Sequence, residues 1–243
     1  MADQNAVQVT ALRKRYRDVT AVDGIDLEIR RGEVFALLGP NGAGKTTTVE
    51  ILEGFRRRDG GEVSVLGADP GRADLAWRAR IGIVLQLTSG ESELTVLELV
   101  RMFAAFYPRP RDPAGTVELV GLTEKAGSRV AKLSGGQVRR LDVALGIVGR
   151  PELLFLDEPT TGFDPQARRQ FWELIRTLRG DGTTIVLTTH YLDEAEALAD
   201  RIAVIAAGRI VAEGTPQTLG GRDRMAVEIR FTLPAGVSTA DLP

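Results

Sequence analysis

The sequence predicts an α/β fold, with an antiparallel β subdomain at the N-terminus and a helical subdomain inserted later in the chain. Three observations support this prediction. Apolar runs such as Val34–Leu38 and Leu153–Leu156 end at glycines or carboxylates, which is typical of buried strands that lead into a site at a sheet edge. Shorter alternating segments precede the first of these runs. Residues 87–149 have mainly helical patterns.

Length and charge limit the class of protein. The 243 residues allow one large or two small domains, and 31 basic residues nearly balance 33 acidic ones. Aromatic residues make up only 5% of the chain, and the basic run Arg56–Arg58 is interpreted as a solvated surface, so we expect no nucleic-acid partner. Cysteine is absent, no signal-peptide pattern is visible, and no apolar run approaches the ~20 residues of a membrane span. We therefore expect a soluble, cytoplasmic chain.

The N-terminal segment predicts three short strands. Val7–Val9 and Ile25–Ile29 alternate between apolar and polar residues, and Glu33–Leu38 becomes a buried apolar run. Tyr16 lies between the first two strands and follows three basic residues. On the residues alone, Tyr16 is expected to be a surface or half-buried ring.

A phosphate-binding loop follows the third strand. It reads Gly39-Pro40-Asn41-Gly42-Ala43-Gly44-Lys45-Thr46, and Thr47 continues into a predicted helix. Two glycines four residues apart, followed by lysine and threonine, form the P-loop pattern. Its glycines let backbone N–H groups turn toward phosphate oxygens, and the helix adds its positive end. Lys45 would contact the β- and γ-phosphates and the Thr46 hydroxyl would bind Mg²⁺. We therefore predict a P-loop NTPase core that binds a nucleoside triphosphate.

The next segment continues the alternation of strands and helices. Residues 60–67 predict a turn and a strand. A helix is expected over Asp74–Arg80, and the apolar strand Ile81–Leu85 follows it and ends at Gln86.

Residues 87–149 predict the inserted helical subdomain. Thr95 and Glu98 have the spacing of a capping box, and three prolines between residues 108 and 113 are expected to break the chain before a short segment around 116–120. Leu133-Ser134-Gly135-Gly136-Gln137 then leads into a helix predicted over Val138–Val148. Ser-Gly-Gly at a helix start is either a second set of anion-binding amides or an ordinary capped turn, and the residues alone leave both readings open.

Two carboxylates end the next buried strand. Leu153–Leu156 leads directly into Asp157 and Glu158, and buried carboxylates are costly unless they meet a cation or line a site. In P-loop proteins the aspartate at this strand's end lies beside the Mg²⁺ held by the loop hydroxyl, which makes Asp157 and Thr46 the expected metal ligands. Glu158 is the candidate for polarising the attacking water.

The last part of the core predicts one helix and one strand. Asp164 and Pro165 are typical of a helix start, and apolar residues between 171 and 178 mark its buried face. The strand Thr183–Thr189 then ends at His190, the single histidine of the chain. A lone histidine is more often structural, but His190 follows a buried strand in the same way as Asp157 does.

The order and spacing of these motifs resemble the nucleotide-binding subunit of an ATP-binding-cassette (ABC) transporter. The resemblance runs from residue 7 to about 220, so residues 1–220 are expected to form the ATPase domain. It implies ATP as the nucleotide, Tyr16 as the ring that stacks on adenine, Gln86 as a ligand of Mg²⁺ and sensor of the γ-phosphate, and His190 as a γ-phosphate contact. One position departs from the family pattern, because Phe163 stands where leucine is usual before Asp164.

The resemblance also implies partners. Ser134, Gly135 and Gly136, with Gln137 in the same signature, would bind the γ-phosphate of ATP held by a second subunit. That subunit is either an identical chain or a related one, and the pair would sit on the inner face of the membrane against a separate integral-membrane permease. The segment around residues 87–107 is where such subunits receive a cytoplasmic helix of the permease.

The sequence around residues 52–55 and 189–195 resembles that of drug-resistance exporters, which makes export the expected direction of transport. The alternative is a soluble ABC ATPase that serves as an assembly factor, for example in iron–sulfur cluster building.

The C-terminal tail, residues 221–243, is interpreted separately. Apolar residues alternate from Met225 to Leu233, which predicts a strand. One strand cannot bury its own apolar face, so we expect either the start of a truncated accessory domain or pairing with another surface.

Overall fold

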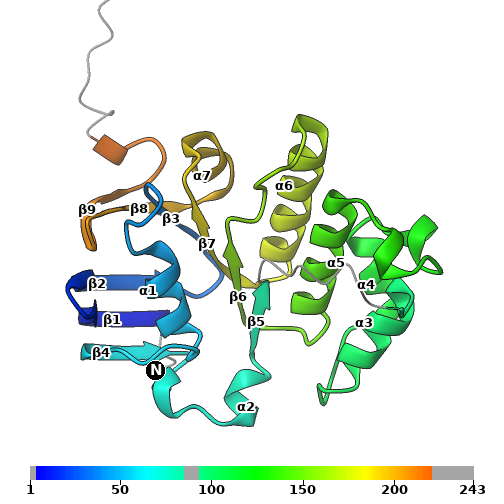
Figure 1. Cartoon of the computed structure of the whole chain (residues 1–243), viewed down its shortest axis with the longest axis horizontal. Coiled ribbons are helices and arrows are strands. Elements are labelled where there is room, and N and C mark those ends of the chain that lie inside the picture. Colours follow the sequence, from blue (N-terminus) through cyan, green and yellow to red (C-terminus); the bar gives the residue numbers. More distant parts are fainter. Residues whose placement is uncertain (1–3, 85–92, 221–243) are drawn as a thin grey trace, which may run out of the picture.

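The computed structural model describes residues 4–84 and 93–220, which form two β-sheets with helices packed around the larger one (Figure 1). The smaller sheet has the strand order β2-β1-β4, and the larger has the order β5-β6-β7-β3-β8-β9. Gln86 and the alternating residues of the tail lie outside the described residues. The α/β fold is confirmed, whereas the proposed domain limits at residues 87, 149 and 220 stay predictions.

The smaller sheet confirms the antiparallel N-terminal part. Its strands are β1 Asn5–Tyr16, β2 Val19–Arg30 and β4 Gly60–Val65, and β1 pairs antiparallel with both neighbours. β1 and β2 have 12 residues each, far longer than the alternating segments Val7–Val9 and Ile25–Ile29 predict. A bulge at Ala11 interrupts the alternation, which is why the pattern does not reveal the rest of β1. Ala11 has a positive φ of 49°, and its N–H donates to Asp26 Oδ1 at 2.8 Å.

Apart from the edge strand β9, the larger sheet is largely buried on both faces. Its strands are β3 Val34–Leu38, β5 Ile81–Val84, β6 Leu153–Asp157, β7 Thr184–Thr189, β8 Arg201–Ala206 and β9 Arg209–Gly214. All pair in parallel except β9, which runs antiparallel to β8. Side chains of β3 alternate between two cores: Val34 and Ala36 pack with the helices α5 and α6, and Phe35 and Leu37 pack with the small sheet and α1. This two-sided burial explains the continuous apolar runs.

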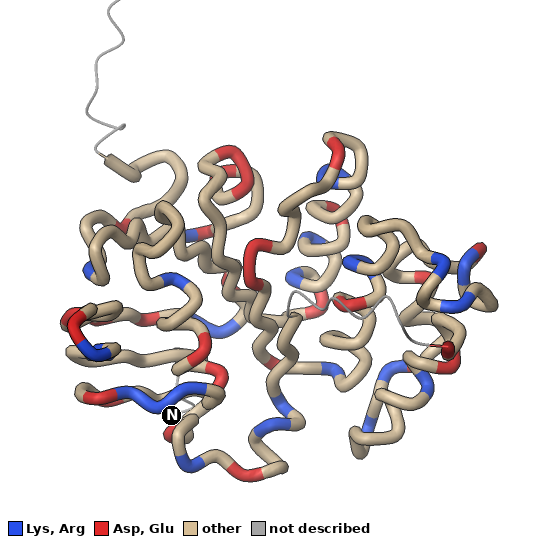
Figure 2. Tube along the Cα trace, in the orientation of Figure 1, with Lys and Arg blue, Asp and Glu red and all other residues tan. Residues whose placement is uncertain are grey.

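Helices cover the sheet and form a layer beside β5 (Figure 1). They are α1 Lys45–Leu52, α2 Leu75–Arg78, α3 Val96–Ala104, α4 Pro113–Leu119, α5 Gly135–Ile147, α6 Pro165–Gly180 and α7 Leu192–Leu198, with 3₁₀ turns at Pro70–Arg72, Thr123–Lys125 and Val130–Lys132. Within the described ranges, no helix is long and apolar enough to cross a membrane. Basic and acidic residues are interspersed along most elements (Figure 2).

Helix starts show where the sequence predictions were right and where they were wrong. The Thr95–Glu98 capping box is present, and Asp164 caps α6 by accepting from two N–H groups at 2.8 Å. Pro113 was expected to break the chain but instead begins α4, because Asp112 caps that helix. Proline is tolerated at this position because a backbone N–H in the first helical turn has no partner within the helix. α5 begins at Gly135 rather than Val138, so the two signature glycines form its first turn.

The helical layer touches the sheet where two glycines let backbones approach closely. A Cβ on Gly82 of β5 would lie 2.3 Å from the carbonyl oxygen of Gly146 in α5, and a Cβ on Gly146 would lie 2.7 Å from Val84 Cγ2. Neither Gly82 nor Gly146 has a positive φ that would favour glycine. The contact between β5 and α5 therefore requires glycine, which has no side chain, at both of these positions.

We expect Gly82→Ala to lower the free energy of unfolding by roughly 1–3 kcal/mol, because the added methyl must push β5 away from α5. Thermal unfolding of the purified chain measures this loss. Gly127→Ala is the matched control, since a Cβ at Gly127 meets nothing within 4 Å. Equal melting temperatures for the two variants would contradict a close contact at Gly82.

Candidate active site

The phosphate loop, the acidic pair and the histidine meet at one edge of the large sheet. β3, β7 and β6 are parallel neighbours, so their carboxyl ends lie side by side. The Gly39 N–H after β3 donates to Thr189 O of β7, and the Glu158 N–H after β6 donates to Thr188 O, both at 3.2 Å. These bonds bring together three motifs that are far apart in the sequence.

The loop backbone is packed too tightly for side chains at two glycines. A Cβ on Gly39 would lie 2.3 Å from Ile205 O, and one on Gly44, which has a φ of +107°, would lie 2.3 Å from Ala21 O. The Ala43 N–H donates back to Pro40 O at 3.2 Å, which closes the loop. A cavity of about 480 Å³ lies beside this loop and is lined by Ala21, Asn41, Gly42, Gly44, Lys45, Thr46, Thr47, Asp157 and Glu158.

Lys45 is the buried cation of this site. Its side chain is only 4% exposed, and its ammonium donates to Gly39 O at 2.8 Å and to Pro40 O at 3.2 Å. Lys45 Nζ also lies 3.4 Å from Glu158 Oε1. A phosphate group entering the cavity would meet a charge that is already positioned by its own loop, and would compete with Glu158 for it.

Glu158 is held in an unusual backbone conformation. Its φ is +44°, which few non-glycine residues adopt. Its N–H donates to Thr188 Oγ1 at 3.0 Å, and Oε2 accepts from Thr161 Oγ1 at 3.4 Å. His190 Nδ1 lies 3.3 Å from Glu158 Oε1, close enough for an ion pair but without hydrogen-bond geometry. The strained residue thus places one carboxylate between Lys45 and His190.

A hydroxyl and a carboxylate provide oxygen ligands that suit a hard divalent cation. Thr46 Oγ1 lies 3.4 Å from Asp157 Oδ2, and Asp157 Oδ1 accepts a hydrogen bond from Thr188 Oγ1. Oxygen donors of this kind fit Mg²⁺, which keeps several waters and draws further ligands from substrate phosphates. Gln86, the third predicted ligand, lies outside the described residues.

Tyr16 lies at the end of β1 with cations near its ring. Lys14 Nζ is 5.4 Å and Arg56 Cζ is 5.2 Å from the ring centroid, and Arg56 is held by Glu50 at 2.5 Å. The ring is half-buried, as expected from its basic neighbours. Its role in stacking on adenine stays a prediction.

The signature residues occupy the start of α5. Ser134 and Gln137 form a capping box, with Ser134 N–H donating to Gln137 Oε1 at 3.0 Å and Gln137 N–H approaching Ser134 Oγ at 3.4 Å. A Cβ on Gly135 or Gly136 would meet nothing within 4 Å. Within the described residues, no hydrogen bond or ion pair joins this turn to the P-loop of the same chain. Gly135 is exposed and Gly136 is half-buried, so a side chain at either position would enter open space.

Arg139, which joins α5 to the end of β6, was not among the site residues predicted from the sequence. This residue is 9% exposed, and its guanidinium donates to Asp157 O at 2.7 Å, Pro159 O at 3.2 Å and Glu158 O at 3.4 Å. Burial lowers the pKa of Arg139, and the carbonyl dipoles stabilise its charge. The available signal was a basic residue on the otherwise apolar face of the predicted helix, with Asp142 three residues later.

A P-loop with a buried lysine, a carboxylate pair and a histidine at the carboxyl edge of a parallel sheet defines a nucleotide-hydrolysing ATPase core. The ABC transporter family profile matches residues 22–161. The chain belongs to the ABC transporter family, as an ATP-binding subunit that hydrolyses ATP.

Relatives at the sequence level are ATP-binding proteins named for drug resistance or for Nod factor export. The chain is 44% identical over 251 residues to the daunorubicin resistance ATP-binding protein DrrA3 of Streptomyces coeruleorubidus, which covers 100% of this chain and 79% of that protein. It is also 44% identical over 219 residues to the Nod factor export ATP-binding protein I of Ralstonia nicotianae, covering 88% of this chain and 68% of that protein.

Solved structures share the same fold. CbiO1 of Clostridium perfringens, part of the ABC transporter complex cbiONQ, has a TM-score of 0.80 and 28% identity over 88% of this chain and 90% of its own. The dimeric cassette MJ0796, bound to ADP and Pi after hydrolysis, has a TM-score of 0.78 and 25% identity over 86% and 98% of the two chains.

We expect Tyr16→Ala to weaken ATP binding by ~1–3 kcal/mol, the scale of base–aromatic stacking. Tyr16→Phe keeps the ring and should bind almost normally, so it is the control. Calorimetric titration with ATP measures both variants. Equal losses would show that the hydroxyl, and not the ring, is what matters.

We expect Arg139→Met to reduce kcat by ~10–100-fold with little change in KM for ATP, because a displaced Glu158 misplaces the reacting water while the P-loop stays intact. Arg139→Lys should recover part of kcat. Arg140→Met is the control, since the neighbouring Arg140 donates to Gln170 of α6 rather than to the carbonyls at the end of β6. A parallel rise in KM and loss of melting temperature in Arg139→Met would indicate a structural role only.

Proposed function

We propose that this chain is the ATPase subunit of an exporter that works as a dimer beneath a separate membrane permease. The observation that carries the proposal is the division of the site. The P-loop, Asp157, Glu158 and His190 converge at one sheet edge, whereas Gly135 and Gly136 begin α5 in a different layer of the fold.

Each side chain has one proposed task in ATP hydrolysis. Lys45 and the loop amides hold the β- and γ-phosphates, and Tyr16 stacks on adenine. Glu158 accepts a proton from the water whose oxygen attacks the γ-phosphorus, as the bond to the β-phosphate oxygen breaks to give ADP and phosphate. His190 contacts the γ-phosphate. In this structure its Nδ1 lies 3.3 Å from Glu158 Oε1, so the two side chains reach the same part of the site.

The magnesium ligands are proposed as Thr46, Asp157 and, outside the described residues, Gln86. When bound, Mg²⁺ neutralises charge that develops on the β- and γ-phosphate oxygens. Thr188 fixes the orientation of the Asp157 carboxylate by donating to its Oδ1. This hydrogen bond leaves Asp157 Oδ2 beside the Thr46 hydroxyl, at 3.4 Å.

Ionic contact between Lys45 and Glu158 suggests how the free subunit is kept idle. At 3.4 Å, the ammonium of Lys45 and the carboxylate of Glu158 balance each other's charge. Phosphates would draw the Lys45 ammonium toward the cavity, which frees Glu158 to act on water. Binding of the triphosphate and activation of the base are therefore parts of one event.

A second chain would close the nucleotide site. The P-loop, Ala21 and the acidic pair of this chain line the 480 Å³ cavity, and the signature amides of a partner, arranged about a two-fold axis, would close it. The dimeric state of MJ0796 with ADP and Pi supports this arrangement. Cleavage of the γ-phosphate would then release the two halves, a motion that a permease can use.

Export is favoured over the assembly-factor alternative by the relatives, which are drug-resistance and Nod factor export proteins. The permease would bind from the membrane side, near residues 87–107, and hold the chain on the inner face of the membrane. Purification of a tagged chain in detergent distinguishes the two functions. An exporter subunit should retain an integral membrane protein, whereas an iron–sulfur assembly factor should not.

We expect Glu158→Gln to form a stable dimer with ATP and Mg²⁺, because ATP binds while the base that activates water is missing. Adding Ser134→Arg should return the protein to a monomer by blocking the partner's phosphate contact. Size-exclusion chromatography at high protein concentration measures both states, with Thr123→Arg as an exposed charge control in the same layer. A dimer that survives Ser134→Arg would rule out the arrangement across two chains.

A further inference from the structure

A single buried hydroxyl contacts both acidic residues of the site. Thr188 lies near the carboxyl end of β7, the strand between β6 and β3, and its Cα is in register with that of Asp157. Its side chain is fully buried. Thr188 Oγ1 accepts the Glu158 N–H at 3.0 Å and donates to Asp157 Oδ1. One hydroxyl therefore joins the proposed metal ligand to the residue that carries the proposed base.

The Glu158 amide decides where the Thr188 proton points. A hydroxyl group has one proton and two lone pairs, and a backbone N–H can only donate. The Glu158 N–H therefore occupies a lone pair of Oγ1 and leaves the proton for Asp157 Oδ1. The direction of both hydrogen bonds is thus determined by the backbone at the end of β6.

The same contact supports the strained backbone of Glu158. Its N–H lies 3.2 Å from Thr188 O and 3.0 Å from Thr188 Oγ1, so one residue supplies two acceptors to an amide whose φ is +44°. Strained conformations of this kind persist where the surroundings hold them. Rotation of this peptide would carry the Glu158 carboxylate away from Lys45 and His190, which lie 3.4 Å and 3.3 Å from Oε1.

The two carboxylate oxygens of Asp157 contact different hydroxyls. Oδ1 accepts from Thr188, and Oδ2 lies 3.4 Å from Thr46 Oγ1 at the nucleotide cavity. Turning the carboxylate would break the hydrogen bond to Thr188. The Thr188 hydroxyl therefore determines which oxygen of Asp157 is presented beside Thr46.

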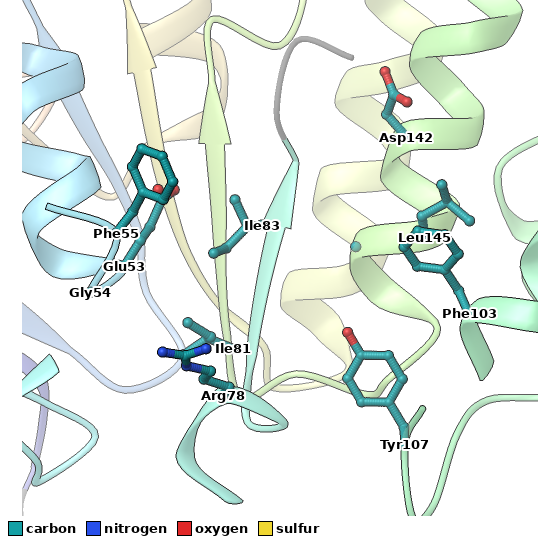
Figure 3. A pocket seen from close by; sticks show the side chains of 11 residues that line it. Glu53, Gly54, Phe55, Arg78, Ile81, Ile83, Phe103, Tyr107, Asp142 and Leu145 are labelled. Carbon is teal, nitrogen blue, oxygen red and sulfur yellow. The ribbon is translucent and has the colours of Figure 1, made fainter. Parts of the chain in front are cut away.

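Two other buried acids lack such a donor. Glu53 and Asp142 lie on opposite walls of a groove of about 610 Å³ between the end of α1 and the helical layer (Figure 3). Among the described residues, no hydroxyl is hydrogen-bonded to either carboxylate, and burial raises the pKa of Glu53 to about 8 and that of Asp142 to about 7. A metal ligand must be charged. Thr188 gives Asp157 the hydroxyl donor that these two acids do not have.

We infer that Thr188 is a positioning residue that couples the metal site to the catalytic base. Its hydroxyl orients the Asp157 carboxylate toward Mg²⁺ and holds the Glu158 peptide so that the base faces the attacking water. The inference rests on the proposed function, in which Asp157 binds Mg²⁺ and Glu158 activates water. It adds the residue that links these two tasks.

Thr188→Val tests the inference, because it removes the hydroxyl and keeps the branched shape, while the backbone oxygen of residue 188 still accepts the Glu158 N–H. We expect the Mg²⁺ concentration for half-maximal binding of a non-hydrolysable ATP analogue to rise about tenfold, and kcat at saturating Mg²⁺ to fall ~10–100-fold. Calorimetric titration measures the binding. Affinity for the analogue in EDTA should not change, and Thr188→Ser should restore both losses.

Thr184→Val is the matched control. Thr184 lies on the same strand and is 2% exposed, but its hydroxyl accepts the Gly32 N–H at 2.9 Å at the opposite end of β7. This variant should keep the wild-type Mg²⁺ dependence and kcat, and melting temperature measures the stability lost in each variant. If Thr184→Val lowers kcat as far as Thr188→Val does, loss of a buried strand hydroxyl is sufficient and the inference is overturned.

Other outcomes identify which link is wrong. Wild-type Mg²⁺ dependence in Thr188→Val would overturn the link to Asp157, and full recovery of kcat at saturating Mg²⁺ would overturn the link to Glu158. An equal loss of analogue affinity in EDTA would place the damage in the P-loop and would also overturn the inference.

Asp157→Asn separates failure of the inference from failure of the proposed function. If Asp157→Asn keeps the wild-type Mg²⁺ dependence of analogue binding, the proposed metal ligand is wrong. If Asp157→Asn loses that dependence and Thr188→Val retains it, only the present inference fails.

Discussion

A buried ammonium group at the edge of the parallel sheet determines the arrangement of the whole candidate site. Lys45 is 4% exposed, and an unpaired charge at that depth would be strongly destabilising. Its acceptors are the carbonyl oxygens of Gly39 and Pro40 and the carboxylate of Glu158. These acceptors are in reach because the loop after β3 folds back, with the Ala43 N–H donating to Pro40 O, and because β6 ends at the same edge of the sheet, one strand away across β7. The carboxylate of Glu158 is thus part of what stabilises the buried ammonium of Lys45.

Much of this arrangement could be predicted from the sequence, because it is encoded locally. A glycine loop after an apolar run, two carboxylates after another and a histidine after a third indicate strands of one parallel sheet, whose carboxyl ends must meet. The caps of α3 and α6 were also predicted correctly, since Thr95 with Glu98 and Asp164 with Pro165 act within one helical turn.

The missed features depend on contacts between distant residues or on context. Arg139 and Glu53 look like ordinary helix-surface charges in the sequence, and only the folded structure buries them. Arg139 is buried where it donates to the carbonyls of Asp157 and Pro159. Strand β1 was predicted too short because its bulge at Ala11 is stabilised by Asp26 of the neighbouring strand. Pro113 has two possible meanings, a break or a helix start, and Asp112 decides between them only through its side-chain hydrogen bond to Gly115.

Helix α5 joins three regions that the proposed cycle must coordinate. Its first turn presents the amides of Gly135 and Gly136, its second places Arg139 on the carbonyls that position Glu158, and Asp142 then faces the groove. Because α5 also packs directly on β5 through Gly82 and Gly146, it cannot tilt without shifting at least one of these contacts. The first turn of α5 and the guanidinium that contacts the strand before Glu158 therefore belong to the same rigid body. The carboxylate of Glu158 lies at the point where that body meets the P-loop core.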